Sequence, residues 1–116
     1  MSVTKLQDLQ TYQLSRDLIK LSYPILSKLN DRDYRSQMIK SSLSITSNIA
    51  EGYGRFSRPE FAKFLAYSNG SALEFRTQLE ACVDIGLIQI EVAAPVIDMC
   101  DRICAMNYKL IQSLRR

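Results

Sequence analysis

The sequence predicts an all-α protein that folds as one antiparallel up-and-down four-helix bundle over residues 1–116. In four long segments, apolar residues recur at alternating spacings of four and three, the periodicity of a helix with one buried face. Short breaks containing Gly, Asn or Asp separate the segments, and connections of this length favour antiparallel neighbours. The length is close to the commonest domain size, so we expect a single core.

The first helix is predicted over about residues 11–29. Its apolar face is formed by Leu14, Leu18, Leu21 and Ile25. Pro24 lies inside this pattern, where it removes a backbone hydrogen bond and clashes with the preceding turn. We therefore expect a kink near Leu21.

The second helix is predicted over about residues 34–52. Its repeating face is formed by Met38, Ser42, Ile45 and Ile49. The many serines are weak helix formers, but their small side chains permit close approach of another helix. A strand over 43–46 would have no partner strand, which favours the helix. The glycines at 52 and 54 suit the left-handed residue that ends a helix.

The third helix is predicted over residues 57–86. Ser57 and Glu60 form a capping-box pair, and Pro59 lies in the first turn, where its missing N–H has no cost. Gly86 closes the helix. A heptad seam runs along it, as in helical bundles, through Phe61, Leu65, Ser68, Ala72, Phe75, Leu79 and Cys82.

The fourth helix, predicted over about residues 91–114, carries two adjacent apolar rows. The first row contains Val92, Val96, Met99, Ile103, Met106 and Leu110, and the second contains Ala93, Ile97, Cys100, Cys104 and Ile111. Both rows together can form one wide buried face. Alternatively, the second row forms an oligomer interface through Ile97, Cys104 and Ile111.

Charge is unevenly distributed along the chain, although the net charge is only +3. Residues 74–101 carry six acidic residues and one basic residue, whereas residues 102–116 carry four basic residues and no acidic one. Such polarity could drive head-to-tail pairing of copies or form a basic patch on one molecule. The alternative is an ordinary solvated surface.

The residue types argue against catalysis. The chain has no histidine, which excludes Ser-His-Asp and Cys-His arrangements and the commonest metal ligand. The three cysteines fit buried, reduced thiols. Gly52-Tyr53-Gly54 lacks the preceding strand and the third glycine of a phosphate-binding loop. We predict no catalytic residue, metal, cofactor or small-molecule substrate.

The chain shows no signal for a membrane. Its first residues contain no apolar region of the kind found in signal peptides. No stretch approaches the roughly 20 apolar residues that a membrane-spanning helix needs. We therefore expect a soluble cytoplasmic protein.

A basic cluster surrounds the predicted turn between the second and third helices. Arg55, Arg58 and Lys63 are interleaved there with Tyr53 and Phe56, and Arg35 and Lys40 lie toward the other end of the second helix. Arginine with aromatic residues suits phosphate contact and base stacking in a nucleic acid. The alternative is a solvated turn with aromatics that anchor it. Folding the two helices back on each other about this turn predicts an ion pair between Arg35 and Glu74.

Residues 44–55, Ser-Ile-Thr-Ser-Asn-Ile-Ala-Glu-Gly-Tyr-Gly-Arg, are followed by Ser57, Glu60 and Gly70-Ser71-Ala72-Leu73-Glu74. From Leu9 to about Leu87 the chain resembles the bacterial four helix bundle proteins, also called 23S rRNA intervening-sequence proteins. Tyr12 and Thr46 stand where that family usually has Trp and Pro. The motif positions are Asn48, Glu51, Gly52, Gly54, Arg55, Ser57, Glu60, Ser71 and Glu74.

The resemblance implies a four-helix bundle that assembles as a ring-like homopentamer, with ribosomal RNA as an expected partner. Together with the basic turns, it leads to the hypothesis of a non-enzymatic oligomer that binds structured RNA. The alternative hypothesis is a protein–protein scaffold or adaptor without nucleic-acid binding, whose partner surface is the second apolar row of the fourth helix.

Overall fold

The protein consists of four α-helices preceded by one short 3-10 helix. The computed structural model describes residues 5–116, so residues 1–4 of the predicted domain lie outside the described residues. The elements are η1 (Leu6–Asp8), α1 (Gln10–Leu26), α2 (Arg32–Tyr53), α3 (Arg58–Asp84) and α4 (Ile90–Leu114). The predicted bounds of all four helices lie within three residues of these, and η1 was not predicted.

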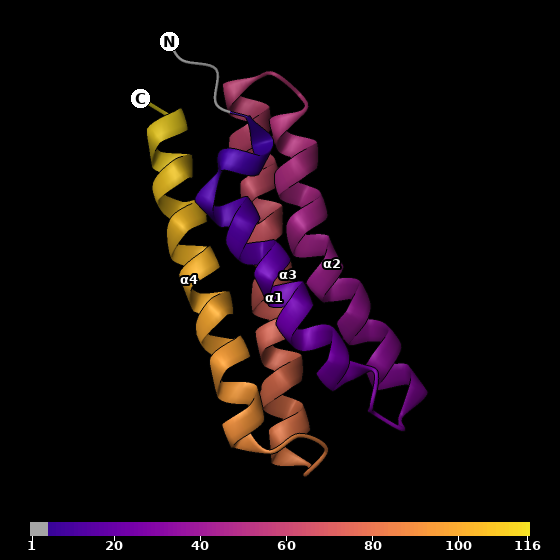
Figure 1. Ribbon diagram of the computed structural model, residues 1–116. Helices are drawn as coiled ribbons and strands as arrows, with labels where there is room; N and C mark the ends of the chain where they lie inside the picture. The colour runs from indigo at the N-terminus through magenta and orange to yellow at the C-terminus, as the bar shows by residue number, and fades with distance from the viewer. Residues whose placement is uncertain (1–4) are drawn as a thin grey trace.

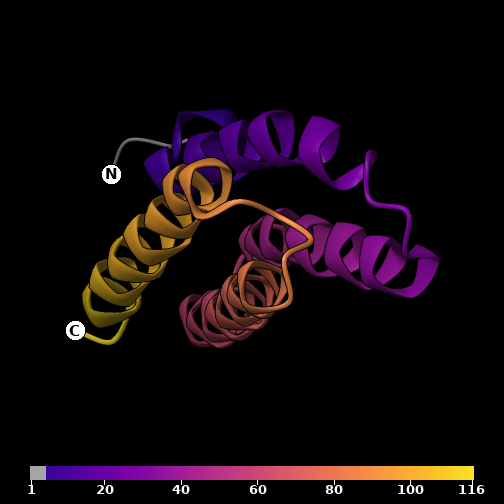
Figure 2. The ribbon, with the colours of Figure 1, turned by 90° about the horizontal axis from the view of Figure 1, so that it is seen from below.

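The four helices form an elongated bundle with extents of 48 × 20 × 20 Å. Each helix packs against its neighbours in chain order, and α1 completes the bundle by packing against α4 (Figure 1). Seen from below, α3 lies across the bundle from α1 (Figure 2). The predicted all-α up-and-down bundle is confirmed. Within residues 5–116, no helix is long and apolar enough to span a lipid bilayer.

Side-chain caps begin α2 and α3. The Asp31 carboxylate accepts a hydrogen bond from the backbone N–H of Tyr34 at 3.0 Å, and Ser57 Oγ accepts one from the N–H of Glu60 at 3.3 Å. These bonds satisfy donors that have no partner inside a helix. The predicted N-terminus of α3 is thereby confirmed, and Gly86, with φ of 79°, follows its C-terminus.

The end of α2 differs from the prediction. Gly54 has a right-handed φ of −71°, and the left-handed residue is Phe56, with φ of 53°. The prediction that a glycine provides the left-handed residue here was therefore wrong. Gly52 lies inside α2, where a Cβ atom would stand 2.6 Å from the Cβ of Phe64. It permits the close approach of α3 instead of ending the helix.

The predicted seams of α2 and α3 form the core, whereas α1 buries its predicted face only in the first half of the helix, at Leu14 and Leu18. In α1 the side chain of Leu21 is 43% exposed, while Ser22 and Leu26 are buried. From Leu18 onward the buried row therefore runs at a spacing of four, and such a row winds around the helix. This agrees with the oblique course of α1 across the bundle (Figure 1). The helix continues through Pro24 and ends at Leu26.

In α4, one wide face is buried. It combines members of both predicted rows with a polar residue that neither row contained: Ala93, Val96, Cys100, Ile103, Asn107 and Ile111. Val92, which the first row placed in the core, is exposed.

A buried polar cluster connects all four helices. Asn107 of α4 is fully buried, and its Oδ1 accepts a hydrogen bond from Thr11 Oγ1 of α1 at 2.6 Å. Its Nδ2 donates to Asn69 Oδ1 at 2.8 Å and to Ser68 Oγ at 3.3 Å, both on α3. Ser68 Oγ in turn donates to the carbonyl of Ile45 on α2 at 2.8 Å. Because buried polar groups are costly without partners, these bonds specify how the helices align.

The register between α2 and α3 corrects one prediction. Ser44 Oγ and Ser71 Oγ are 2.8 Å apart, and Ser41 Oγ donates to the Oε1 atom of Gln78 at 2.6 Å. These pairs shift α3 by several residues relative to the predicted alignment. Accordingly, none of the ion pairs in the described chain joins Arg35 to Glu74, and Arg35 donates a hydrogen bond to the carbonyl of Leu29.

Candidate nucleic-acid interface

The predicted binding residues fall at two separate ends of α2. Arg35 and Lys40 lie near its start, and Tyr53 lies at its end, followed by Arg55 in the turn. Twenty residues of helix span roughly 30 Å, so Arg35 and Arg55 do not share one small site. The turn between α2 and α3 lies at the same end of the bundle as the C-terminus of α4 (Figure 1). We call this the basic end, formed by residues 53–63 and 113–116.

Arg55 and Lys63 present half-exposed cations at the basic end. Arg55 Nη2 lies 3.2 Å from Glu51 Oε1, and Lys63 Nζ lies 3.0 Å from Glu60 Oε2. Their charged groups stand 5.0 and 5.7 Å from the centre of the Phe64 ring. Exposed ion pairs of this kind contribute little to stability, so a polyanion can displace the carboxylates.

Arg58 joins the two parts of the basic end, the start of α3 and the end of α4. Its Nε donates to the carbonyl of Leu114 at 3.2 Å, and its Nη2 donates to the carbonyl of Ser113 at 2.9 Å. The last carbonyls of a helix have no partner within it, and they carry partial negative charge. Arg58 therefore holds the end of α4 against the start of α3. Tyr53 is packed edge-on against Phe61, with ring centres 6.1 Å apart.

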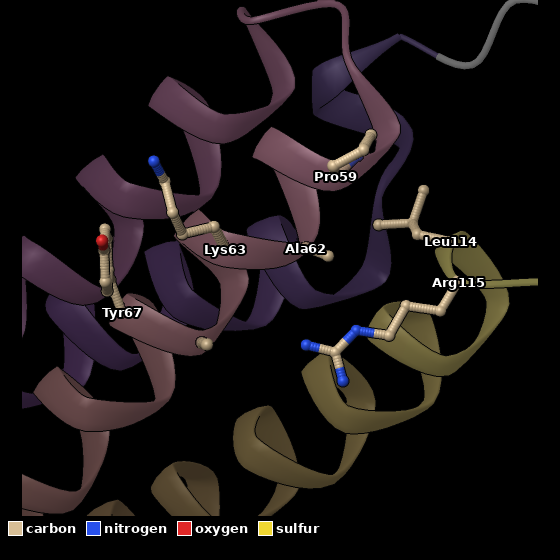
Figure 3. A pocket seen from close by; sticks show the side chains of 7 residues that line it. Pro59, Ala62, Lys63, Tyr67, Leu114 and Arg115 are labelled. Atoms are coloured by element: carbon tan, nitrogen blue, oxygen red, sulfur yellow. The ribbon is translucent and has the colours of Figure 1, made fainter.

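A hollow of about 530 Å³ lies between the start of α3 and the end of α4. Its lining consists of Pro59, Ala62, Lys63, Ala66, Tyr67, Leu114 and Arg115. The Arg115 side chain extends from the end of α4 toward α3, and Lys63 and Tyr67 stand on the other side of Ala62 (Figure 3). Arg115 takes part in none of the four ion pairs found in residues 5–116.

Sequence reasoning did not predict that Arg115 and Tyr67 line this hollow. Arg115 belongs to the basic block at 102–116, and antiparallel order places the end of the fourth helix beside the start of the third. Combining these two observations would have found it. Tyr67 carried no such signal, because an exposed tyrosine in the middle of a helix has no distinctive pattern.

Most of the motif residues build the α2–α3 hairpin. Asn48 Nδ2 donates to the carbonyl and to Oγ of Ser44, at 2.9 and 3.0 Å, and Ser44 contacts Ser71 across the helices. Gly52 permits close approach, Ser57 caps α3, and Glu51 and Glu60 form the ion pairs described above. Glu74 is exposed on α3.

The residues predicted for an oligomer interface lie partly in the core. Ile111 is only 8% exposed, and Ile97 and Cys104 are half-buried side chains that pack against the core. The use of Ile97 and Cys104 at an interface between copies stays a prediction.

The three thiols are poorly suited to nucleophilic chemistry. Burial raises the pKa of Cys100 to about 12 and also raises the pKa values of Cys82 and Cys104. The thiolate is the reactive form, so these side chains are weak nucleophiles near neutral pH. In the part of the chain that the structure describes, no group of His, Cys, Asp and Glu side chains is arranged to hold a metal ion.

We expect Cys100 to make the folded protein lose stability as the pH becomes alkaline. The pKa of Cys100 in the folded protein lies above the value of 9.0 for an unperturbed thiol. Its contribution to the free energy of unfolding is therefore complete below pH 9 and is lost as the pH rises toward 12. The free energy of unfolding should then fall by up to about 1.4 kcal/mol per pH unit from this group. Denaturant unfolding of wild type and Cys100→Ala over this range tests it: the variant should lose less stability, and equal losses would contradict the prediction.

Comparison with known proteins adds a family and a fold. Residues 7–109 match the profile of the family described as 23S rRNA-intervening sequence protein. A crystal structure of a protein of unknown function from the S23 ribosomal protein family of Bacteroides thetaiotaomicron is similar, with a TM-score of 0.76 and 21% sequence identity. The similarity covers 92% of this chain and 98% of that chain. No curated protein matches the sequence.

Proposed function

The chain belongs to the 23S rRNA-intervening sequence protein family, and from this membership we propose that it is a non-enzymatic bundle that binds structured RNA, with ribosomal RNA as the first candidate. The RNA contacts the basic end, where Arg55, Lys63 and Arg115 face the solvent. The protein works as a cytoplasmic homo-oligomer, a homopentamer in the arrangement that the family resemblance implies.

The observation that carries this proposal is the meeting of two distant basic segments across the hollow. Lys63 of α3 and Arg115, which directly follows α4, line it from two sides, and Arg58 holds the two helices together. Cations on a rigid frame suit the phosphates of a folded RNA, whose backbone supplies most of the affinity. An oligomer would repeat this patch, so several weak contacts would act together.

The residue chemistry supports a binding role over catalysis. Without histidine the chain lacks the commonest general base, and its thiols, whose pKa values are raised, are weak nucleophiles. Exposed cations at one end of the bundle, in contrast, can bind an RNA backbone without any catalytic group.

We expect the double variant Lys63→Gln, Arg115→Gln to weaken binding to a structured 23S rRNA fragment. Each lost phosphate contact should reduce the slope of log affinity against log salt by about 0.7 to 0.9. Fluorescence anisotropy across a salt series measures both effects. Arg58 is left unchanged in this variant, because its loss would also free the end of α4.

The matched control is Lys20→Gln, Lys28→Gln, which removes the same amount of charge. Lys20 is exposed in the second half of α1, and Lys28 is exposed just after that helix ends. This control should bind almost as wild type does. Equal weakening in both double variants would show that net charge alone, and not the basic end, holds the RNA. Absence of wild-type binding at low salt would refute the proposed function.

A protein–protein scaffold remains the second candidate, and one observation favours it. The exposed apolar side chains of Leu87, Ile90 and Val92 gather around the loop between α3 and α4, at the end of the bundle opposite the basic end. Under this alternative they would contact a partner protein, and RNA binding would be absent in the same experiment.

A further inference from the structure

Phe56 combines two features that the fold itself does not require. Its side chain is 90% exposed, more than any other large apolar residue of the described chain, and its backbone φ of 53° is left-handed. A left-handed conformation strains residues with a Cβ atom, and bulky residues adopt it rarely. In residues 5–116, the ring of Phe56 takes part in none of the aromatic or cation–ring contacts.

Other residues would fit this position with less strain. Chains that leave a helix through a left-handed residue usually place Gly there, and sometimes Asn. A polar residue would also avoid exposing an apolar ring to water. The folded state therefore gains little from phenylalanine at position 56, and an observed backbone outlier of this kind points toward a function.

The surroundings indicate what the ring contacts. Phe56 lies in the turn between α2 and α3, flanked in sequence by Arg55 and Arg58, and Lys63 and Arg115 lie at the same end. A flat, exposed apolar ring at the same end of the bundle as these cations matches an anionic polymer that also exposes flat aromatic groups. Unpaired bases in RNA loops and bulges have this chemistry, because proteins stack aromatic side chains on them while cations contact the backbone.

We propose that Phe56 stacks on an unpaired base of the bound RNA while the neighbouring cations hold its phosphates. The RNA class recognised is then a stem with a bulge or loop, and not a continuous duplex. This inference rests on the proposed RNA-binding function and specifies which feature of the RNA is read.

Two labelled RNA probes test the proposal: a fully paired RNA hairpin, and the same hairpin with a bulge of unpaired uridines. Wild type should prefer the bulged probe. Phe56→Leu, which keeps an apolar side chain but removes the ring, should bind the bulged probe roughly fivefold to a hundredfold more weakly. Its affinity for the paired hairpin should not change. Phe56→Tyr should restore the preference, and Tyr23→Leu, at an exposed tyrosine on α1, should bind as wild type does.

A stability measurement separates stacking from a structural role. Phe56→Asn removes the ring and places at φ of 53° a residue that tolerates this conformation. Its thermal midpoint should equal or exceed that of wild type, while its preference for the bulged probe disappears. A midpoint several degrees lower would show that Phe56 supports the fold, and would overturn the proposal.

The outcomes distinguish the two levels of inference. If wild type and Phe56→Leu bind each of the two probes with the same affinity, the RNA-binding function stands and the stacking role is refuted. If wild type binds neither probe, the proposed function fails, and the stacking role fails with it. Binding of the protein to anionic lipid vesicles through Phe56, without any RNA binding, would likewise overturn the proposed function and the stacking role.

Discussion

Replacing Gly52 with alanine is expected to destabilise the bundle by about 1–3 kcal/mol, although alanine is normally the better helix former. The added Cβ would stand 2.6 Å from the Cβ of Phe64 and 3.1 Å from Cδ1 of Phe61. The Phe61 ring can rotate away, but the Cβ of Phe64 is fixed to its backbone, so α3 must move. Chemical denaturation of the variant and of wild type measures the loss.

Gly54→Ala is the matched control for this prediction. A Cβ at position 54 would meet only ordinary contacts, with the carbonyl of Ala50 at 3.5 Å, and the backbone there is right-handed. Its stability should remain within about 0.5 kcal/mol of wild type. Similar losses at both positions would contradict the close-approach explanation, and so would a stable Gly52→Ala variant.

Substituting leucine for Asn107 is expected to reduce the free energy of unfolding by about 2–4 kcal/mol. Leucine has the same number and branching of side-chain heavy atoms, so the change removes the hydrogen bonds without opening a cavity. The hydroxyl of Thr11 and the side-chain oxygen of Asn69 would then be left without their partner on α4. Groups left unpaired in this way cost more than the bond itself contributes. Urea unfolding measures the change.

A second substitution tests whether the loss comes from the unpaired groups. Adding Thr11→Val to Asn107→Leu removes both partners of one bond, so part of the lost stability should return. Gln112→Leu, at an exposed position of α4, should leave stability nearly unchanged. A double variant that is simply the sum of two losses would show that Thr11 and Asn107 are not coupled.

The sequence predicted the local structure of this protein well, because local structure depends on neighbouring residues. The heptad seam of α3 and the face of α2 led to the correct core, and Ser57 with Glu60 located the start of α3. The seam of α1 was less accurate, since Leu21 fitted the spacing yet is exposed while Ser22 is buried. Spacing assumes that a helix lies along its neighbours, and α1 crosses them obliquely.

The candidate site could be predicted only in part. Arg55, Arg58 and Lys63 were found because they are close together in the sequence. The predicted basic cluster lacked Arg115, because only the packing of α4 brings that residue near Lys63. The sequence also could not distinguish Arg58, which is bonded to the carbonyls of Ser113 and Leu114, from Arg55 and Lys63, which face the solvent. Such roles depend on which groups lie across the helix boundary.

By itself, the sequence determined the helices, their order and the absence of histidine-based chemistry, all of which follow from residue type and spacing along the chain. The tertiary structure alone decided the register of α2 on α3, the burial of Asn107 at the meeting of four helices, and the left-handed conformation of Phe56. The physical reason is that register and burial depend on side chains far apart in the sequence. Gly52 illustrates this: its pattern suggested a helix end, and only the position of Phe64 shows that it allows two helices to touch.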